Sequence, residues 1–422
     1  GALVVRTCAQ SLSDAQVAAV KQNLATGATK SWELGTRAQA LLELDAPAFS
    51  VVNASTAVPP ATPLNASANA SLVDVLTIAR NAVVALPSGF ASNASGQPLI
   101  DGNGSAGDPA SLGVAVLLAN WTGLQGADYA GAAAAQMRYL LDTVPKTTDG
   151  AISHRVSEVQ LWSDSVYMVP PFLAYYGVTT DNQSMVQEAY NQIKLYRNYL
   201  RDSNGGWRHI SLGSFNDTGH WSTGNAWAAA GMLRVFGTMQ NSQFSRSFKN
   251  QMKDLSNWVF EIQQAMYANL TSSDLFPNYA DQPDSFGDAS STALMASTVY
   301  RLSLLADRHT FLPLAERTRQ TLFAMNASSP PSPAISASTS AVASASATAP
   351  ASSNTAFASA VHFSSDGWLA PVVNPESFGQ QGAASPEGEA FVLMMHSAWR
   401  DWVAAGSVGA NGAATLRGGL LG

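Results

Sequence analysis

The chain has 422 residues and a formal net charge of −7, and only 12% of its residues are charged. Binding to nucleic acid needs clustered cations that neutralise phosphates, and this sequence has no run of basic residues, so we exclude a nucleic-acid partner. No apolar run reaches the roughly 18–20 residues of a membrane-spanning helix, so we expect no membrane partner. The hydrophobic fraction of 46% is ample for a large buried core and predicts a globular protein.

Apolar residues recur at spacings of three and four along most of the chain, which is the period of an amphipathic α-helix. The pattern predicts about twelve helices, near residues 13–25, 31–44, 71–86, 110–119, 127–143, 163–176, 182–202, 223–239, 243–270, 288–306, 310–325 and 386–405. Few strands are needed, although short extended pieces such as Trp207–Ile210 should form small hairpins at the mouth of the fold.

Two kinds of helix alternate in the middle of the chain. Segments 182–202, 243–270 and 288–306 carry a single apolar stripe, which is typical of helices with one wet face. Other segments are apolar nearly all round and should be buried on every side: Ser111–Ala119, Ser165–Tyr176, Thr223–Phe236 and Gly388–Ala398. An inner ring and an outer ring satisfy this alternation, so we predict an all-α fold, an (α/α)6 barrel of six helical hairpins closed into a toroid. Pro170 and Pro171 should kink or break one inner helix.

We interpret residues 1–422 as a single domain with two irregular segments. Residues 327–355 are almost entirely Ala, Ser, Thr and Pro and lack the apolar content to bury anything, which indicates a flexible insertion before the last hairpin. A linker between two domains is the alternative. Residues 406–422 are rich in Gly, and we expect them to form an extended surface tail.

Several features predict a secreted protein that works outside the cell or in the cell wall. The chain begins at Gly1, which fits a mature form after removal of a signal segment. The single cysteine, Cys8, cannot form an internal disulfide. We expect a monomer that carries N-linked glycans. Asn-x-Ser/Thr sequons occur at Asn53, Asn65, Asn69, Asn93, Asn103, Asn120, Asn182, Asn216, Asn269 and Asn326.

Acidic residues precede several predicted inner helices, and in a closed ring the loops that carry them gather at one end. Asp164 opens an apolar helix beside Trp162 and Tyr167. It is either a helix cap or a carboxyl whose pKa an apolar wall raises, which could then hold a proton near neutral pH. Two such carboxyls facing each other would supply the pair that glycosidic chemistry uses. The sequence leaves open which two, and the further candidates are Asp108, Asp284, Asp288, Glu387 and Glu389.

Two segments combine glycine, tryptophan and polar side chains in a way that suits a saccharide site. They are Gly205–His209 and His220–Trp227. Aromatic faces stack on the C–H surfaces of sugars, and glycine allows the backbone to come close. The alternative is that Trp221 and Trp227 are core residues at helical spacing. His154 and the histidines of these segments form no His-x-x-x-His or Cys-containing pattern, so we expect no metal and no cofactor.

The segment Gln160-Leu-Trp-Ser-Asp-Ser-Val-Tyr-Met-Val-Pro-Pro-Phe-Leu173 resembles the signature segment of glycoside hydrolase family 105, the unsaturated rhamnogalacturonyl hydrolases. Relatives in family 88 act on unsaturated glucuronyl ends. His154 and His220-Trp-Ser-Thr-Gly-Asn-Ala-Trp227 match further blocks of the family. The resemblance covers roughly residues 100–310 and is greatest to secreted fungal members. It implies an (α/α)6 barrel with the active site in its mouth.

The resemblance also implies a hydration mechanism that needs no metal. Asp164 falls on the position of the general acid and base, which protonates the 4,5 double bond of a terminal unsaturated uronic acid and assists the addition of water. The resulting hemiketal opens, and the glycosidic bond breaks. Asp108 corresponds to a second family aspartate. Around this pair we expect the contacts to an oligosaccharide substrate: His154, Arg155, Trp162, Tyr167, Trp207, Arg208, His209, His220, Trp221, Asn225 and Trp227.

One position departs from the family pattern, because Thr223 stands where the family usually has arginine. A bidentate arginine is the natural partner of a uronate carboxylate. Arg155, Arg208, His209 or His220 must therefore supply the charge, or the substrate is different.

Two other functions remain open. One is a different glycosidase on the same barrel, inverting and α-mannosidase-like, with Asp108 and Asp164 as its two carboxyls. The other is a non-catalytic glycan-binding protein of the cell wall that kept the cleft.

Overall fold

The computed structural model describes residues 11–53, 57–60, 66–326 and 355–410. The described part contains twelve α-helices, and each coincides with a predicted one. They are α1 Asp14–Gly27, α2 Ser31–Asp45, α3 Ala66–Val84, α4 Gly113–Trp121, α5 Tyr129–Arg138, α6 Ser165–Thr179, α7 Gln183–Leu200, α8 Ser222–Gln240, α9 Lys249–Tyr267, α10 Ala289–Ala306, α11 Leu312–Leu322 and α12 Pro386–Ala404. Cys8, Asn65, the predicted insertion up to residue 354 and the predicted tail beyond residue 410 lie outside the described residues.

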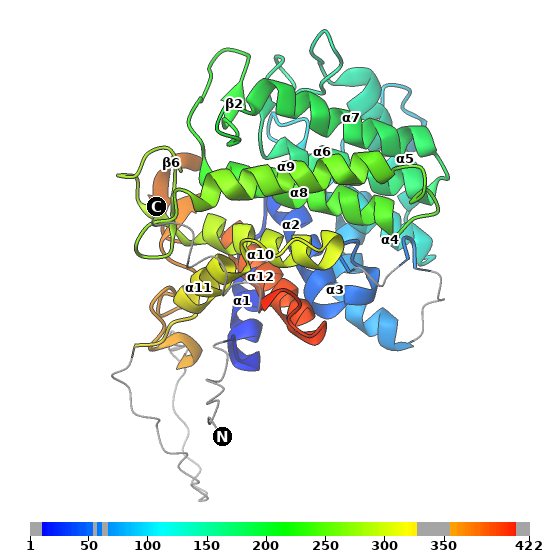
Figure 1. Cartoon of the computed structure of the whole chain (residues 1–422). Helices are drawn as coiled ribbons and strands as arrows, with labels where there is room; N and C mark the ends of the chain where they lie inside the picture. The colour runs from blue at the N-terminus through cyan, green and yellow to red at the C-terminus, as the bar shows by residue number, and fades with distance from the viewer. Residues whose placement is uncertain (1–10, 54–56, 61–65, 327–354, 411–422) are drawn as a thin grey trace, which may run out of the picture.

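The contacts between the helices define two concentric rings, whose members are labelled in Figure 1. In the inner ring α2, α4, α6, α8, α10 and α12 contact one another in this order, and α12 returns to α2. The other helices pack outside them, for example α7 on α6, α9 on α8 and α11 on α10. The fold is therefore the predicted (α/α)6 barrel. None of the helices in the described ranges is both long and apolar enough to cross a membrane.

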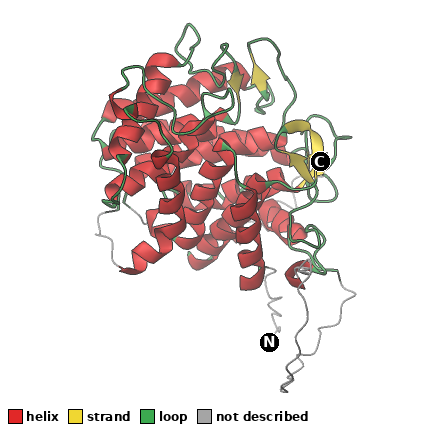
Figure 2. Ribbon diagram, turned by 180° about the vertical axis from the view of Figure 1, so that it is seen from behind, coloured by secondary structure: helices red, strands yellow, loops and turns green. Residues whose placement is uncertain are grey.

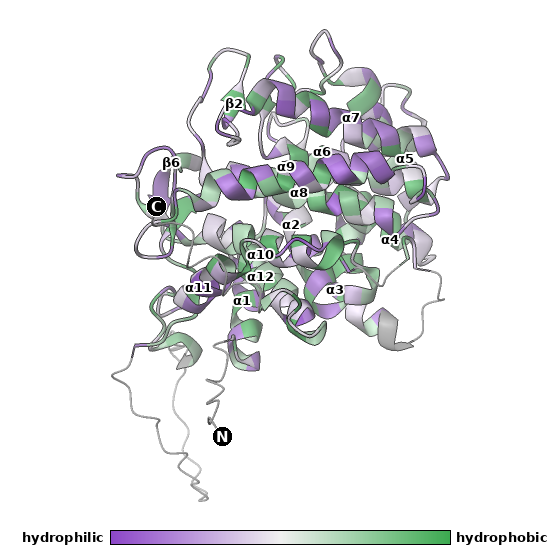
Figure 3. Ribbon diagram, in the orientation of Figure 1, coloured by the Kyte–Doolittle hydropathy of each residue, from purple (hydrophilic) through white to green (hydrophobic). Residues whose placement is uncertain are grey.

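The two rings differ in hydropathy as the periodicity predicts, with one exception. Figure 3 shows hydrophilic residues along the outward faces of α7 and α9, whereas α6, α8 and α12 are buried almost throughout. The exception is segment 288–306, which carries a single apolar stripe although the acidic residues before it predict an inner helix. It forms the inner helix α10 and is almost wholly buried. Most of its buried polar side chains have hydrogen-bond partners; for example, the Thr298 hydroxyl donates to a carbonyl of the same helix at 2.7 Å. Arg301 is paired with Glu43 at 2.8 Å and Asp401 at 2.6 Å.

Of the two outcomes expected at Pro170 and Pro171, a kink or a break, the break does not occur, because α6 continues through both. Each proline removes one N–H, which leaves the carbonyls of Val166 and Tyr167, four residues earlier, without a helical partner. The Tyr167 carbonyl accepts instead from the buried guanidinium of Arg234 in α8, at 3.1 Å. A neighbouring helix thus compensates for one of the lost hydrogen bonds.

Short antiparallel strand pairs connect the loops at one end of the barrel. β1 Leu161–Trp162 pairs with β2 Ile210–Ser211, β3 Phe276–Pro277 with β4 Gly287–Asp288, and β5 Val372–Asn374 with β6 Ser377–Gly382. The β1–β2 pair agrees with the extended piece predicted near Trp207–Ile210. Figures 1 and 2 show the strands gathered on one side of the helices, at the left in Figure 1. This is the side on which the loops before the inner helices meet.

Most sequon asparagines of the described residues reach the surface. Asn53 is partly buried, and eight others are exposed: Asn69, Asn93, Asn103, Asn120, Asn182, Asn216, Asn269 and Asn326. N-glycosylation is therefore sterically open at these sites and stays a prediction.

The contact between α6 and α8 should be intolerant of any added atom at Gly231. A Cβ there would lie 2.2 Å from the carbonyl oxygen of Val166, which is backbone and cannot turn away. We expect Gly231→Ala to lower the free energy of unfolding by about 1–3 kcal/mol, although alanine is the better helix former. Gly379→Ala, where a Cβ meets nothing within 4 Å, is the control. Equal stability of the two variants in urea denaturation would contradict this.

Candidate active site

A cavity of about 290 Å³ lies among the loops that precede the inner helices. Five inner helices reach it with residues at or beside their N-terminal ends: Lys30 and Trp32 from α2, Asp108 before α4, Asp164 before α6, Trp221 before α8 and Glu387 from α12. The other lining residues come from the connecting loops, the β5–β6 turn and the helix interiors: Gly102, Asn103, Ser105, His154, Arg155, Trp162, Met168, His209, Trp227, Pro375, Glu376 and Phe378.

Asp164 stands at the N-cap position of α6, but its side chain makes no capping hydrogen bond. The interpretation of the Asp164 side chain as a helix cap is therefore wrong. The Asp164 carboxyl lines the cavity, and its Oδ1 atom is buried without a partner. A buried polar atom without a partner costs about 1–3 kcal/mol, and a ligand or water in the cavity would offset that cost.

Asp108 lies in the same cavity, at the start of a 3-10 turn, Asp108–Leu112, that leads into α4. Its backbone N–H donates to the Ser105 hydroxyl at 3.1 Å. Burial, and next the nearby charge of Asp164, raise the pKa of Asp108 to about 8. The Asp108 carboxyl is therefore mainly neutral at pH 7 and can donate a hydrogen bond beside Asp164 without like-charge repulsion.

His154 forms part of the wall between these carboxyls and Trp162. Its ring stacks on Trp162 with 4.8 Å between centroids and an interplanar angle of 23°. Burial lowers the pKa of His154 to about 4, so the imidazole is neutral at physiological pH. Its Nδ1 atom has no hydrogen-bond partner among the described residues.

His209 is fixed from behind by a carboxylate. Its Nδ1 lies 2.9 Å from Oδ2 of Asp217, and the Tyr279 hydroxyl donates to the same oxygen at 2.5 Å. The contact with Asp217 holds the ring through Nδ1 and leaves Nε2 as its second polar atom. Nε2 is buried and unpartnered, and the rings of Trp221 and Phe378 lie 4.4 and 4.6 Å from the imidazole centroid. The cavity thus combines flat aromatic walls with isolated polar atoms.

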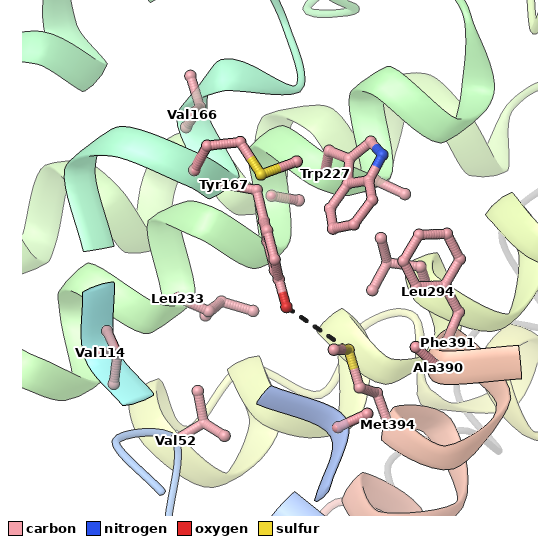
Figure 4. Packing of buried hydrophobic residues seen from close by; sticks show 14 of the residues in the cluster. Val52, Val114, Val166, Tyr167, Trp227, Leu233, Leu294, Ala390, Phe391 and Met394 are labelled. Atoms are coloured by element: carbon pink, nitrogen blue, oxygen red, sulfur yellow. Dashed lines mark hydrogen bonds between the residues drawn. The ribbon is translucent and has the colours of Figure 1, made fainter. Parts of the chain in front are cut away.

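Tyr167, predicted as a substrate contact, lies outside this cavity. Figure 4 shows its ring directed into the core of the barrel, with the hydroxyl 3.9 Å from the sulfur of Met394. Its ring packs on Trp227 at 4.3 Å and carries the Arg234 guanidinium over its face at 4.5 Å. The helical period that starts at Asp164 turns Tyr167 inward, so this prediction is wrong.

Four further predicted contacts also lie away from the cavity. Trp207 is fully buried, and the side-chain amide of Asn225 bonds its backbone N–H and carbonyl at 2.8 and 2.9 Å, which makes both residues part of the framework. Arg208 is exposed and does not line the cavity. His220 lies 2.7 Å from Asp202, as a second His–Asp pair outside the cavity. In contrast, Asp108, Asp164, His154, Arg155, Trp162, His209, Trp221 and Trp227 are brought together.

Thr223 stands where the family usually has arginine, and the structure shows which other cations lie at the cavity. Thr223 is fully buried behind the wall and donates to Asp288 at 3.1 Å, so it does not line the cavity. Lys30 does line it but is engaged with Glu376 at 2.9 Å. The guanidinium of Arg155 makes no hydrogen bond or ion pair with any residue that the structure describes, and it is the cation available to an anionic ligand.

The sequence alone does not identify several of the residues that line the cavity. Trp32 lies at the start of a helix whose sequence does not show that its end faces the site. Glu376 and Phe378 belong to the β5–β6 hairpin, where no periodicity marks a role. Glu387 was one of several candidate carboxyls, and the sequence does not show which of them face the site.

A second and larger cavity, of about 610 Å³, lies between α2, α3 and the segment 86–101. Its lining is largely aliphatic, with Arg37 and Asp74 among its polar residues, and contains no histidine or aromatic ring. We locate the candidate active site in the smaller cavity because the carboxyls, imidazoles and aromatic rings converge there.

Comparison with known proteins gives consistent results. Residues 106–340 match the sequence profile of Glycosyl Hydrolase Family 88. An unsaturated 3S-rhamnoglycuronyl hydrolase from Formosa agariphila is 30% identical over 115 residues, and the match covers 24% of this chain and only 30% of that enzyme.

Solved structures resemble the whole fold. A possible member of the GH105 family from Salmonella enterica has a TM-score of 0.63 at 14% identity, covering 92% of this chain and 93% of that one. A glycosyl hydrolase family 88 protein from Bacteroides vulgatus has a TM-score of 0.60 at 13% identity, covering 92% and 97%. The fold supports the family assignment, and the profile covers more than half of the sequence. The chain is therefore a glycoside hydrolase that belongs to glycosyl hydrolase family 88.

Proposed function

We propose that the protein hydrolyses oligosaccharides that end in a 4,5-unsaturated uronic acid, and that Asp164 acts as general acid and base in hydration of the double bond. The observation that carries this proposal is the unpartnered Asp164 carboxyl oxygen in one cavity with Asp108. The name of the Formosa agariphila relative, an unsaturated rhamnoglycuronyl hydrolase, supports the same substrate class.

An anionic sugar suits the electrostatics of this end of the barrel. The N-terminal ends of five inner helices meet around the cavity, and a helix N-terminus carries the positive end of the helix dipole, which favours negative charge. Arg155 adds a full positive charge from the loop before β1. In this proposal Arg155 binds the carboxylate of the substrate. The family usually has an arginine for this role at the position of Thr223.

The walls suit a pyranose ring. Trp162, Trp221 and Phe378 line the cavity, and the C–H surface of a sugar packs on the faces of aromatic rings. Neutral Asp108 offers a donor for a sugar hydroxyl, and the unpartnered Nε2 of His209 offers a second polar contact.

In the proposed reaction Asp164 gives its proton to C4 of the double bond, and water adds to C5 as Asp164 takes a proton from it. The product is a hemiketal at C5. The hemiketal opens to a ketone, which turns C1 into a hemiacetal, and that hemiacetal releases the leaving sugar. One water is consumed, and Asp164 ends in its starting protonation state.

Replacement of the catalytic carboxyl should abolish turnover but not binding. We expect Asp164→Asn to lower kcat by about 10²–10⁴-fold with a small change in KM, because the amide cannot transfer the proton. The assay follows loss of the ultraviolet absorbance of the conjugated double bond in an unsaturated uronyl disaccharide. Asp284→Asn, at an exposed loop carboxyl outside the cavity, is the control. Full turnover by Asp164→Asn would remove Asp164 from the mechanism.

The charge of Arg155 should act on substrate affinity. We expect Arg155→Met to raise KM for the unsaturated disaccharide roughly ten- to a hundredfold, the size of a hydrogen bond to a charged group. Arg208→Met, at an exposed arginine that does not line the cavity, is the matched control and should leave KM unchanged. If both variants keep the wild-type KM, another group binds the carboxylate.

We also propose that the protein is secreted as an N-glycosylated monomer. The exposure of eight sequon asparagines supports glycosylation. Treatment of protein from its native host with an N-glycan amidase should lower its mass; an unchanged mass would contradict glycosylation.

A further inference from the structure

The cavity contains a third carboxyl that the proposed mechanism does not use. Glu387 lies in the first turn of α12 and is only 3% exposed. It lines the cavity with Asp108 and Asp164. Its Oε2 accepts a hydrogen bond at 3.0 Å from Nε1 of Trp32, which lies in the adjacent inner helix α2. Its Oε1 has no hydrogen-bond partner among the described residues.

The contact with Trp32 decides which oxygen can carry a proton. An indole N–H is a donor only, so Oε2 must accept. In the neutral acid the carbonyl oxygen is therefore Oε2, and the hydroxyl is Oε1, the atom that has no partner in the protein. The geometry leaves one O–H donor for a group inside the cavity.

The surroundings of Glu387 favour its neutral form. Burial, and next the charge of Glu33 in α2, raise the pKa of Glu387 well above its usual value, and Asp164 and Asp288 act in the same direction. The Trp32 N–H opposes the shift, and so does the N-terminal end of α12.

The cations near this carboxyl are already placed elsewhere. Lys30 is engaged with Glu376 at the rim of the cavity. Arg155 lines the same cavity from another loop. Its positive charge lowers the pKa values of Asp108 and His154, and it is not among the groups that shift the pKa of Glu387.

We propose that Glu387 is a substrate-binding residue that donates a hydrogen bond from Oε1 to an oxygen of the terminal uronyl residue, with Trp32 as the residue that positions it. This inference rests on the proposed function. It explains how three carboxyls can line a site for an anionic sugar: two of them, Asp108 and Glu387, meet it as neutral donors. It also makes Glu387 a determinant of affinity that works only while it holds its proton.

Glu389 provides a matched control two residues away in the same helix. It is also fully buried, and burial raises its pKa to about 8. Its Oε1 accepts from the backbone N–H of Leu369 at 2.7 Å, and it does not line the cavity. The two glutamates therefore share burial and helix position but differ in access to the substrate.

The experiment measures binding of an unsaturated uronyl-rhamnose disaccharide by calorimetry, with Asp164→Asn as the parent protein. Glu387→Gln keeps a donor in place of the acid O–H and should bind within roughly threefold of the parent at acidic pH. Glu387→Met removes the donor and should bind roughly tenfold or more weakly. Glu389→Gln should match the parent. Thermal unfolding checks that each variant is folded, and Glu387→Ala replaces Glu387→Met if the latter is not.

A pH series separates ligand binding from a structural role. As pH rises the parent loses the proton of Glu387, gains a negative charge beside the sugar and should bind progressively more weakly than Glu387→Gln. Both proteins carry Asp108, so its own ionisation cancels in the ratio of their affinities. A structural role of the carboxyl would leave that ratio constant with pH.

Three results would overturn the inference: parent-like binding by Glu387→Met, equal losses in the Gln and Met variants, or a ratio that does not change with pH. Absence of binding by the parent would instead refute the proposed substrate class, on which the inference depends. If Asp164→Asn still turns the disaccharide over, the proposed mechanism fails. The Glu387 and Glu389 variants are then compared with their parent through KM for the disaccharide.

Discussion

The closed ring of inner helices is the constraint on which the rest of the structure depends. Five of the six inner helices start beside one small cavity, so residues at or near their N-terminal ends meet there although these residues are far apart in the sequence. The same arrangement directs the helix N-termini at that cavity. Packing explains the position of the site, and the helix N-termini around it suit the anionic sugar that we propose as substrate.

Burial then determines the chemistry of the acids. Desolvation disfavours a charged carboxylate, and carboxyls that share a cavity raise one another's pKa values. Asp108 and Glu387 have raised pKa values for these two reasons. A site that would repel a uronate if all its acids were ionised can accept one when two of them are neutral. Arg155, the cation without a partner in the described structure, fits the same picture as a group that meets the substrate carboxylate.

Sequence periodicity predicted the fold well and the site in part. Twelve helices and the ring follow from spacings that local sequence encodes. The departures arise where tertiary partners act: Arg234 satisfies the carbonyl that Pro171 frees, and Ser, Thr and a paired Arg301 allow α10 to be buried. The Asp164 motif predicted the site, but Tyr167 in the same motif faces the core. Trp32, Phe378 and Glu387 depend on which helix ends and hairpins meet across the ring, and that information is not local.

Hydration of the double bond requires that a proton reach C4 of the uronyl residue before the glycosidic bond breaks. Nuclear magnetic resonance of the early product formed in heavy water follows that proton. Hydration at this site should give one deuterium at C4 and loss of the double bond together with release of the leaving sugar. Release of the leaving sugar from a residue that keeps its double bond, with no deuterium at C4, would show ordinary cleavage at C1 and exclude hydration.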